Sequence, residues 1–197
     1  MKHLGSPSLA VAMIGVALSC TQVQRQANQS EQPQPYTIQR DVLGESLESF
    51  VANNPNCKPK ADVVENSQMC AASRLATSTT YAGMPIMGKL AKFYQGRLYE
   101  VAIHASTSDC REFGLFSSLK QKFGEPKDTE RIDGKEITPV GGFKIWQNGV
   151  STLTYLESLD TLDLCAATFQ LDAVYSKVHK LEEEKKAEEK EQRKRDM

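Results

Sequence analysis

The sequence KFYQGRLY at residues 92–99 has a counterpart at residues 144–151, KIWQNGVS. In both, a lysine, an apolar residue, an aromatic residue and a glutamine lead into a turn that contains glycine. Asn148-Gly149 is the pair that a type I′ turn prefers, and Gln95-Gly96 occupies the same position in the first segment. Both segments therefore predict β-hairpins.

The residues beside the two turns alternate in the manner of half-buried strands. After the first turn every second residue is apolar or aromatic, and before the second turn Lys144 stands between two apolar residues. We expect four residues to share one face of the first hairpin: Tyr99, Val101, Ile103 and Ala105. A further strand is predicted over residues 162–171, beside the second hairpin, where it carries Cys165.

A predicted helix precedes each hairpin. Ser46 is placed to cap a helix that Pro55 ends, with its apolar residues on one stripe. Residues 116–123 carry apolar side chains at helical spacing, and Gly124 follows as a left-handed cap. The order of helix, hairpin, helix, hairpin and strand predicts an α+β fold, in which tandem units of a helix and an antiparallel β-hairpin form one layered domain.

The first residues have the pattern of an export signal. Lys2 supplies a positive charge, and residues 9–18 (LAVAMIGVAL) form an apolar run too short to span a bilayer. Small residues at positions 17 and 19 suit a signal peptidase. We therefore expect residues 1–19 to be removed as a signal peptide, which leaves Cys20 at the N-terminus.

Cys20 is the predicted lipidation site. The segment ALSC at residues 17–20 resembles the bacterial lipobox, although alanine stands where leucine is usual. The expected location is the periplasmic side of a bacterial membrane, with the lipid on Cys20 as the anchor. Cleavage without lipidation is the alternative, and it would release a soluble periplasmic or secreted protein.

Composition divides the remainder into three parts. Residues 20–35 are rich in glutamine and poor in large apolar side chains, so we expect a flexible tether. Residues 36–178 have the size of one α+β domain. Residues 179–197 are a charged tail, helical or disordered, in which both signs are mixed. A net charge of −1 lacks the basic excess that binding to nucleic acid requires.

The chain has five cysteines, and four remain after Cys20 is set aside. In an oxidising compartment these four can close two disulfides, with three connectivities open. We favour Cys57 with Cys70, across the loop after the first helix, and Cys110 with Cys165, between the second helix and the last strand. No C-x-x-C motif occurs, so a metal site is not expected.

Catalytic motifs are absent from the sequence. His104 is the one histidine inside the predicted domain, and we interpret it as an exposed or edge-strand residue. Two carboxylate pairs, Asp160 with Asp163 and Glu130 with Asp133, suit surface turns as well as a glycosidase site. No cofactor is expected, and a non-catalytic role is favoured.

One helix-and-cysteine pattern points to a known family. Gly44-Glu45-Ser46-Leu47 opens the first helix, and Cys57 and Cys70 follow it before the strands. In tandem, over residues 36–174, this arrangement resembles the secreted β-lactamase inhibitor proteins and the small outer-membrane lipoproteins of the SmpA/BamE type. The second unit departs from the pattern, because its cysteines lie much farther apart. The resemblance implies a sheet whose exposed face or loops bind another protein.

The preferred hypothesis is therefore a lipid-anchored binding or scaffold module with an envelope protein as its partner. Tyr94, Trp146 and Tyr99 are the candidate binding surface, because exposed aromatic side chains are frequent at protein interfaces. A carboxylate-dependent envelope hydrolase is the first alternative. A structural envelope protein without a discrete ligand is the second.

Overall fold

The computed structural model describes residues 33–73, 80–81, 83–127, 131–132, 135–136, 142–157 and 163–196. The predicted signal peptide, Cys20, most of the tether and Leu162 lie outside these residues. All described residues belong to one unit, Pro33–Met197. Among the described helices, none has the length and apolar character needed to cross a membrane.

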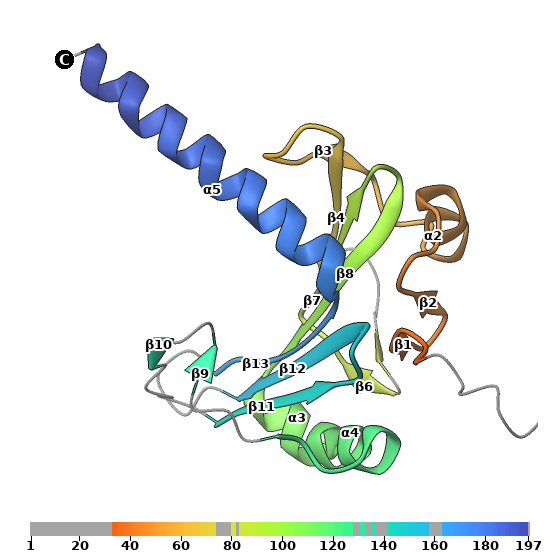
Figure 1. The fold of residues 1–197 in the computed structure, drawn as a ribbon. Helices are drawn as coiled ribbons and strands as arrows, with labels where there is room; N and C mark the ends of the chain where they lie inside the picture. The colour runs from red at the N-terminus through yellow and green to blue at the C-terminus, as the bar shows by residue number, and fades with distance from the viewer. Residues whose placement is uncertain are drawn as a thin grey trace, which may run out of the picture. The chain divides into compact units, whose positions relative to one another are not determined.

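The described chain contains runs of short and long strands separated by helices (Figure 1). In chain order they are β1 (Thr37–Ile38), β2 (Asp41–Val42), α2 (Leu47–Asn53), β3 (Lys60–Ala61), β4 (Ser67–Ser73), β5 (Thr80–Tyr81), β6 (Met84–Pro85), β7 (Gly88–Tyr94), β8 (Arg97–Ala105), α3 (Thr107–Glu112), α4 (Leu115–Phe123), β9 (Arg131–Ile132), β10 (Lys135–Glu136), β11 (Gly142–Gln147), β12 (Ser151–Glu157), β13 (Cys165–Leu171) and α5 (Asp172–Arg195).

The main sheet has seven strands in the order β11-β12-β13-β8-β7-β4-β3, and every neighbouring pair is antiparallel. The α+β class is thereby confirmed. One hairpin supplies β7 and β8, the other supplies β11 and β12, and the two halves of the sheet meet where β8 pairs with β13. The duplication of a helix-and-hairpin unit stays a prediction.

The first hairpin turn has the predicted form. Gln95 and Gly96 both have positive φ, 51° and 71°, as a type I′ turn requires. The second turn differs from the prediction, because Gly149 (φ 83°) has a positive φ and Asn148 does not. Asn148 instead uses its side-chain Oδ1 to accept the N–H groups of Val150 and Ser151. Glycine thus takes the first central position, as in a type II′ turn.

A β-bulge separates Tyr99 from the residues with which it was predicted to share a face. Lys92 pairs with Glu100 but Phe93 pairs with Leu98, so the register shifts between them and Tyr99 is the extra residue. Leu98 and Val101 remain in the main core, whereas Tyr99 joins a second cluster. The expectation for Tyr99 was wrong because one inserted residue reverses the side-chain alternation.

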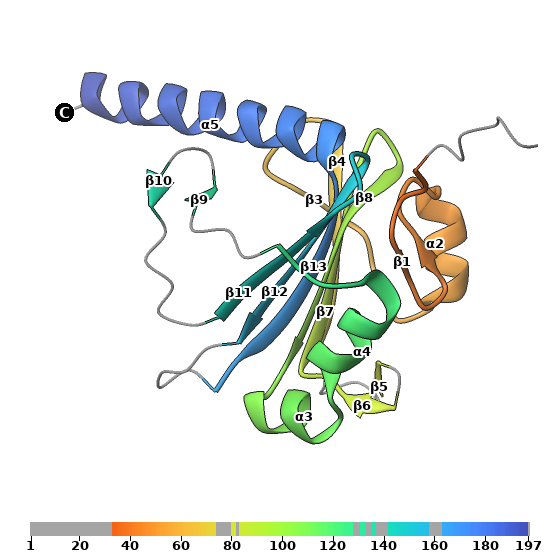
Figure 2. The ribbon, with the colours of Figure 1, turned by 60° about the horizontal axis from the view of Figure 1, so that its bottom comes forward.

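The main core lies between one face of the sheet and helices α2, α3 and α4 (Figure 2). Ser46 caps α2 as predicted, since its Oγ accepts the N–H of Ser49, and the helix ends two residues before Pro55. Phe50 on α2 contacts Phe93 at a ring distance of 5.2 Å. Gly124 ends α4 with φ 83° and ψ −165°, so its φ is positive, but it is not the left-handed cap that was predicted.

Helix α5 packs on the opposite face of the sheet through its first turns. Val178 forms a cluster with Val64 and Tyr99, and the flanking apolar residues of α5 extend this contact as far as Leu181. The predicted domain boundary after residue 178 falls inside this helix. From residue 183 to the C-terminal end of α5 the side chains are exposed. The apolar residues of the first turns therefore attach α5, and its charged remainder has no core to join.

Candidate functional site

The sheet face that carries no α2, α3 or α4 is the most extensive candidate surface, and we call it the open face (Figure 2). The pairing register places these residues on it: Met69, Leu90, Lys92, Glu100, Ala102, His104, Ile145, Thr152, Thr154, Leu156, Ala166, Thr168 and Gln170. All are half-buried except Glu100, Ala102 and Ile145, which are buried. The open face is thus partly accessible from β7 across to β12.

A polar row crosses the open face near the end of the strands that α5 covers. Glu100 is only 6% exposed, and Lys92 Nζ lies 3.5 Å from its Oε1. Gln170 Nε2 donates to Glu100 Oε2 at 3.0 Å. A buried carboxylate requires such partners, because desolvation without them is costly. The Lys92–Glu100–Gln170 group is therefore ordered before any partner arrives.

The next row toward the other end of the strands is composed mainly of small side chains. Leu90 is paired with Ala102, which is paired with Thr168, and Thr168 is paired with Thr154. Alanine and threonine project less far from a sheet than the lysine and glutamine of the polar row. The centre of the open face can consequently be approached closely by groups of another molecule.

Helix α5 limits the open face at one end of the strands. It covers Tyr99, which is 1% exposed, and burial followed by the nearby carboxylates of Glu100 and Asp62 raises the pKa of the Tyr99 hydroxyl. Tyr94 is half-buried, and Lys177 of α5 lies 5.2 Å from its ring centroid. Of the three predicted aromatic residues, Tyr94 alone contributes accessible area at this end.

Trp146 lies on the other side of the sheet. It is 2% exposed, contacts Phe116 of α4 at 6.1 Å between ring centroids, and donates from Nε1 to the Gly124 carbonyl at 2.8 Å. Its strand partner Leu153 belongs to the same core. The predicted surface of Tyr94, Tyr99 and Trp146 is therefore wrong: the three side chains do not share a face, and two of them are buried. The alternation of Thr152, Thr154 and Leu156 was the better signal for an accessible face.

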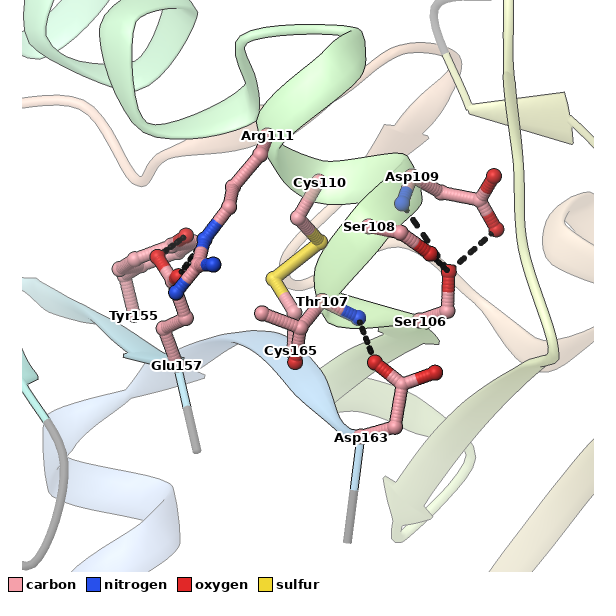
Figure 3. The surroundings of a disulfide bond; sticks show 10 residues. All are labelled: Ser106, Thr107, Ser108, Asp109, Cys110, Arg111, Tyr155, Glu157, Asp163 and Cys165. Carbon is pink, nitrogen blue, oxygen red and sulfur yellow. Dashed lines mark hydrogen bonds and ion pairs between the residues drawn. A yellow bond between two sulfur atoms is a disulfide. The ribbon is translucent and has the colours of Figure 1, made fainter. Parts of the chain in front are cut away.

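Both favoured cysteine pairings are confirmed. Cys57 and Cys70 are bonded with a Cα–Cα distance of 5.3 Å, and Cys110 and Cys165 with a Cα–Cα distance of 6.4 Å. All four are buried. The second disulfide ties α3 to the first residue of β13, the strand that pairs with the central strand β8 and so joins the two halves of the sheet (Figure 3).

The groups around the second disulfide stabilise the same junction. Arg111 Nε lies 2.5 Å from Glu157 Oε1, and the Tyr155 hydroxyl donates to Glu157 Oε2 at 3.0 Å (Figure 3). Asp163 Oδ1 accepts the N–H of Thr107 at the start of α3, at 3.1 Å. These interactions join α3 to the sheet, so we assign the polar side chains around the disulfide a structural role.

The predicted catalytic candidates are not brought together among the described residues. His104 lies in β8, which is paired on both sides, so it is half-buried in the middle of the sheet and not at an edge. Asp163 accepts the N–H of Thr107 at the start of α3. Asp160, Glu130 and Asp133 lie outside the described residues. Within the described ranges no three histidine, cysteine or carboxylate side chains group as a metal site.

Comparison with known proteins found no match to this chain among protein-family models, curated proteins or solved structures. The functional argument therefore depends on the geometry of the described residues.

Proposed function

We propose that this chain is an exported, lipid-anchored protein-binding module of the bacterial envelope, and that its partner docks on the open face. The observation that carries the proposal is the one-sided packing of the sheet. Helices α2, α3 and α4 cover one face, whereas α5 covers only the end of the other near Tyr99. The solvated face of an antiparallel sheet ordinarily carries polar side chains, whereas this face also carries Leu90, Ala102 and Leu156.

The composition of the open face supports docking of a protein. It combines apolar side chains such as Leu90 and Leu156 with threonines and with the ordered Lys92–Glu100–Gln170 row. Protein interfaces have this mixture of apolar contact area and satisfied polar groups. Because the polar row has its internal partners already, docking would not require a buried charge to find a new one.

Attachment to the membrane is the second part of the proposal. The ALSC segment and the Gln-rich residues after it support a lipid on Cys20 followed by a spacer. A spacer lets a folded domain reach partners at a distance from the bilayer. The expected partner is consequently an envelope protein.

Site-specific photocrosslinking in bacterial cells tests the docking face. With p-benzoylphenylalanine at Thr154 or Thr168 of the open face, we expect a discrete adduct with an envelope protein. The same group at Gln121, exposed on α4, is the matched control and should give none. Adding Thr168→Arg should reduce the Thr154 adduct about tenfold, because an unpaired charge is placed in the interface. Ser117→Arg on α4 should leave the adduct unchanged.

The docking proposal fails if the adduct forms equally from Gln121, or if Thr168→Arg has no effect while the variant folds normally by circular dichroism. An adduct whose mass is that of two copies of this chain would make self-association the use of the open face.

Intact mass under non-reducing conditions tests the anchor. Protein purified from membranes of a host with lipoprotein machinery should lack residues 1–19, carry acyl chains and have lost four hydrogens to two disulfides. Cys20→Ala should abolish the acyl mass and leave the disulfides intact. A soluble product cut before Cys20 without lipid would contradict the anchor, and would favour a diffusible binding protein.

A further inference from the structure

Two adjoining hollows lie on the helix-covered side of the molecule, away from the open face. The first is polar, has a volume of about 390 Å³, and is lined by Gln39, Arg40, Asp41, Asn53, Asn54, Thr80 and Lys89. The second is largely apolar, has a volume of about 250 Å³, and is lined by Gln39, Tyr81, Met84, Phe113, Leu115, Ser118, Leu119 and Lys122. Neither was indicated by the sequence analysis.

A buried, fully partnered network lies in the wall of the polar hollow. Asp41 is paired with Lys89, and Asn54 donates to Asp41 Oδ1 at 3.0 Å while accepting from Lys89 Nζ at 2.9 Å. Lys89 also lies 5.1 Å from the ring centroid of Phe50. The charges of Asp41 and Lys89 cancel, so this wall is rigid and close to neutral.

The side chain of Arg40 gives the polar hollow a net positive charge. Its side chain is exposed, and no ion pair or hydrogen bond of its guanidinium occurs within the described residues. Lys122 lines the second hollow and donates to the Thr37 carbonyl at 3.0 Å. This hydrogen bond holds the positive charge of Lys122 beside the second hollow. A ligand with an anionic group is therefore complementary to the pair of hollows, and a guanidinium can hold a carboxylate through two hydrogen bonds.

The apolar hollow has the size and lining for one side chain. Met84, Leu115 and Leu119 are buried core residues that form its floor, and Phe113 at its wall is 44% exposed. A large apolar side chain left this exposed at the wall of a hollow gains from covering by a partner. An aromatic or leucine side chain would bury both itself and Phe113.

Gln39 and the strand β5 join the two hollows. Gln39 lines both, and Thr80 and its neighbour Tyr81 line one each. Tyr81 lines the apolar hollow, and burial, followed by the charge of Asp41, raises the pKa of its hydroxyl. Gln39 has a φ of 55° because it is the first central residue of the two-residue turn between β1 and β2, and tight hairpin turns require a positive φ there.

We propose that these hollows form one binding site for the C-terminal residue of a peptide whose last side chain is apolar. The side chain enters the hollow over Met84, Leu115 and Leu119, and the terminal carboxylate meets Arg40. The last peptide groups lie along Gln39 and Thr80, whose side chains can donate and accept hydrogen bonds. This site is separate from the open face, so it can fail or hold independently of the docking proposal.

Calorimetric titration of the folded domain with acetyl-Gly-Gly-Phe tests the proposal. We expect the peptide with a free carboxylate to bind at least about tenfold more tightly than its C-terminal amide, and than acetyl-Gly-Gly-Gly. Arg40→Gln should remove the preference for the free acid and leave the amide unaffected. Ser118→Trp, an exposed position at the apolar hollow, should block both. Arg193→Gln, on the exposed part of α5, is the matched control and should bind as the wild type does.

Four outcomes would overturn the site. One is equal binding of the acid and the amide by the wild-type protein, and another is loss of affinity in Arg193→Gln as large as in Arg40→Gln. The third is binding of phenylacetate as tight as that of the peptide, which would assign the hollows to small free acids. Absence of any heat with the wild-type protein at millimolar peptide would likewise end the proposal.

Discussion

Replacing Trp146 with alanine is expected to lower the free energy of unfolding by about 3–5 kcal/mol, the usual loss for a buried large aromatic residue. Trp146 is 2% exposed, packs against Phe116, and donates its indole N–H to the Gly124 carbonyl. The substitution empties the space under α4 and leaves that carbonyl without its donor. Urea unfolding followed by far-UV circular dichroism measures the loss, because the variant contains no tryptophan for fluorescence.

Two further variants test the separate contributions to this loss of stability: one keeps the packing but removes the hydrogen bond, and the other changes a neighbouring position on the same strand. Trp146→Phe keeps an aromatic ring but no donor, so its loss should be smaller, with about 1 kcal/mol from the missing hydrogen bond. Gln147→Ala changes the exposed neighbour on the same strand and should stay within about 0.5 kcal/mol of the wild type. A loss below about 1 kcal/mol for Trp146→Ala would mean that Trp146 is on the surface after all.

Removing the disulfide between Cys110 and Cys165 by a double alanine substitution is expected to cost about 4 kcal/mol on the chain-entropy account. The bond closes a sequence separation of 55 residues and ties α3 to the first residue of β13. Because β13 joins the two halves of the sheet, its loosening should affect the whole unit. The measurement is urea unfolding under non-reducing conditions, compared with the wild-type protein.

The other disulfide provides the matched control for chain entropy. Cys57 and Cys70 are separated by 13 residues, so their double alanine variant should lose about 3 kcal/mol, less than the first pair. The entropic account would be refuted by the opposite order. A loss near zero for Cys110 and Cys165 would show that hydrogen bonds such as the one from the Thr107 N–H to Asp163 Oδ1 hold α3 without the covalent bond.

Local sequence patterns were sufficient to predict the elements that depend on residues close to one another in the sequence. The Ser46 cap and the Gln95-Gly96 turn depend on residues only a few positions apart, and both were predicted correctly. The two disulfides were also predicted, because each cysteine was assigned to an element whose approximate place was already known. The type of the second turn was not, since the Asn148 side chain bonds the backbone and leaves glycine to take the positive φ.

The candidate surfaces could not be predicted in the same way. The face on which Tyr99 lies depends on a bulge in its pairing with β7, and the face of Trp146 depends on where α4 docks. Neither cause is present in the periodicity of a single strand. The hollows beside Gln39 require β1–β2, α2, β5–β6, β7 and α4 to meet, so no continuous segment carries their pattern.

The amino-acid sequence by itself determined the α+β class, the capped first helix, the hairpins and the supply of cysteines, because these follow from short-range geometry and alternation. The tertiary structure alone decided that β8 pairs with β13, that Trp146 and Tyr99 are buried on opposite faces, and that the open face and the two hollows exist. The physical reason is that a side chain is buried only when a second element packs against the one that carries it. A side chain is covered or exposed according to what packs against it, and the chain brings that neighbour from far along its length.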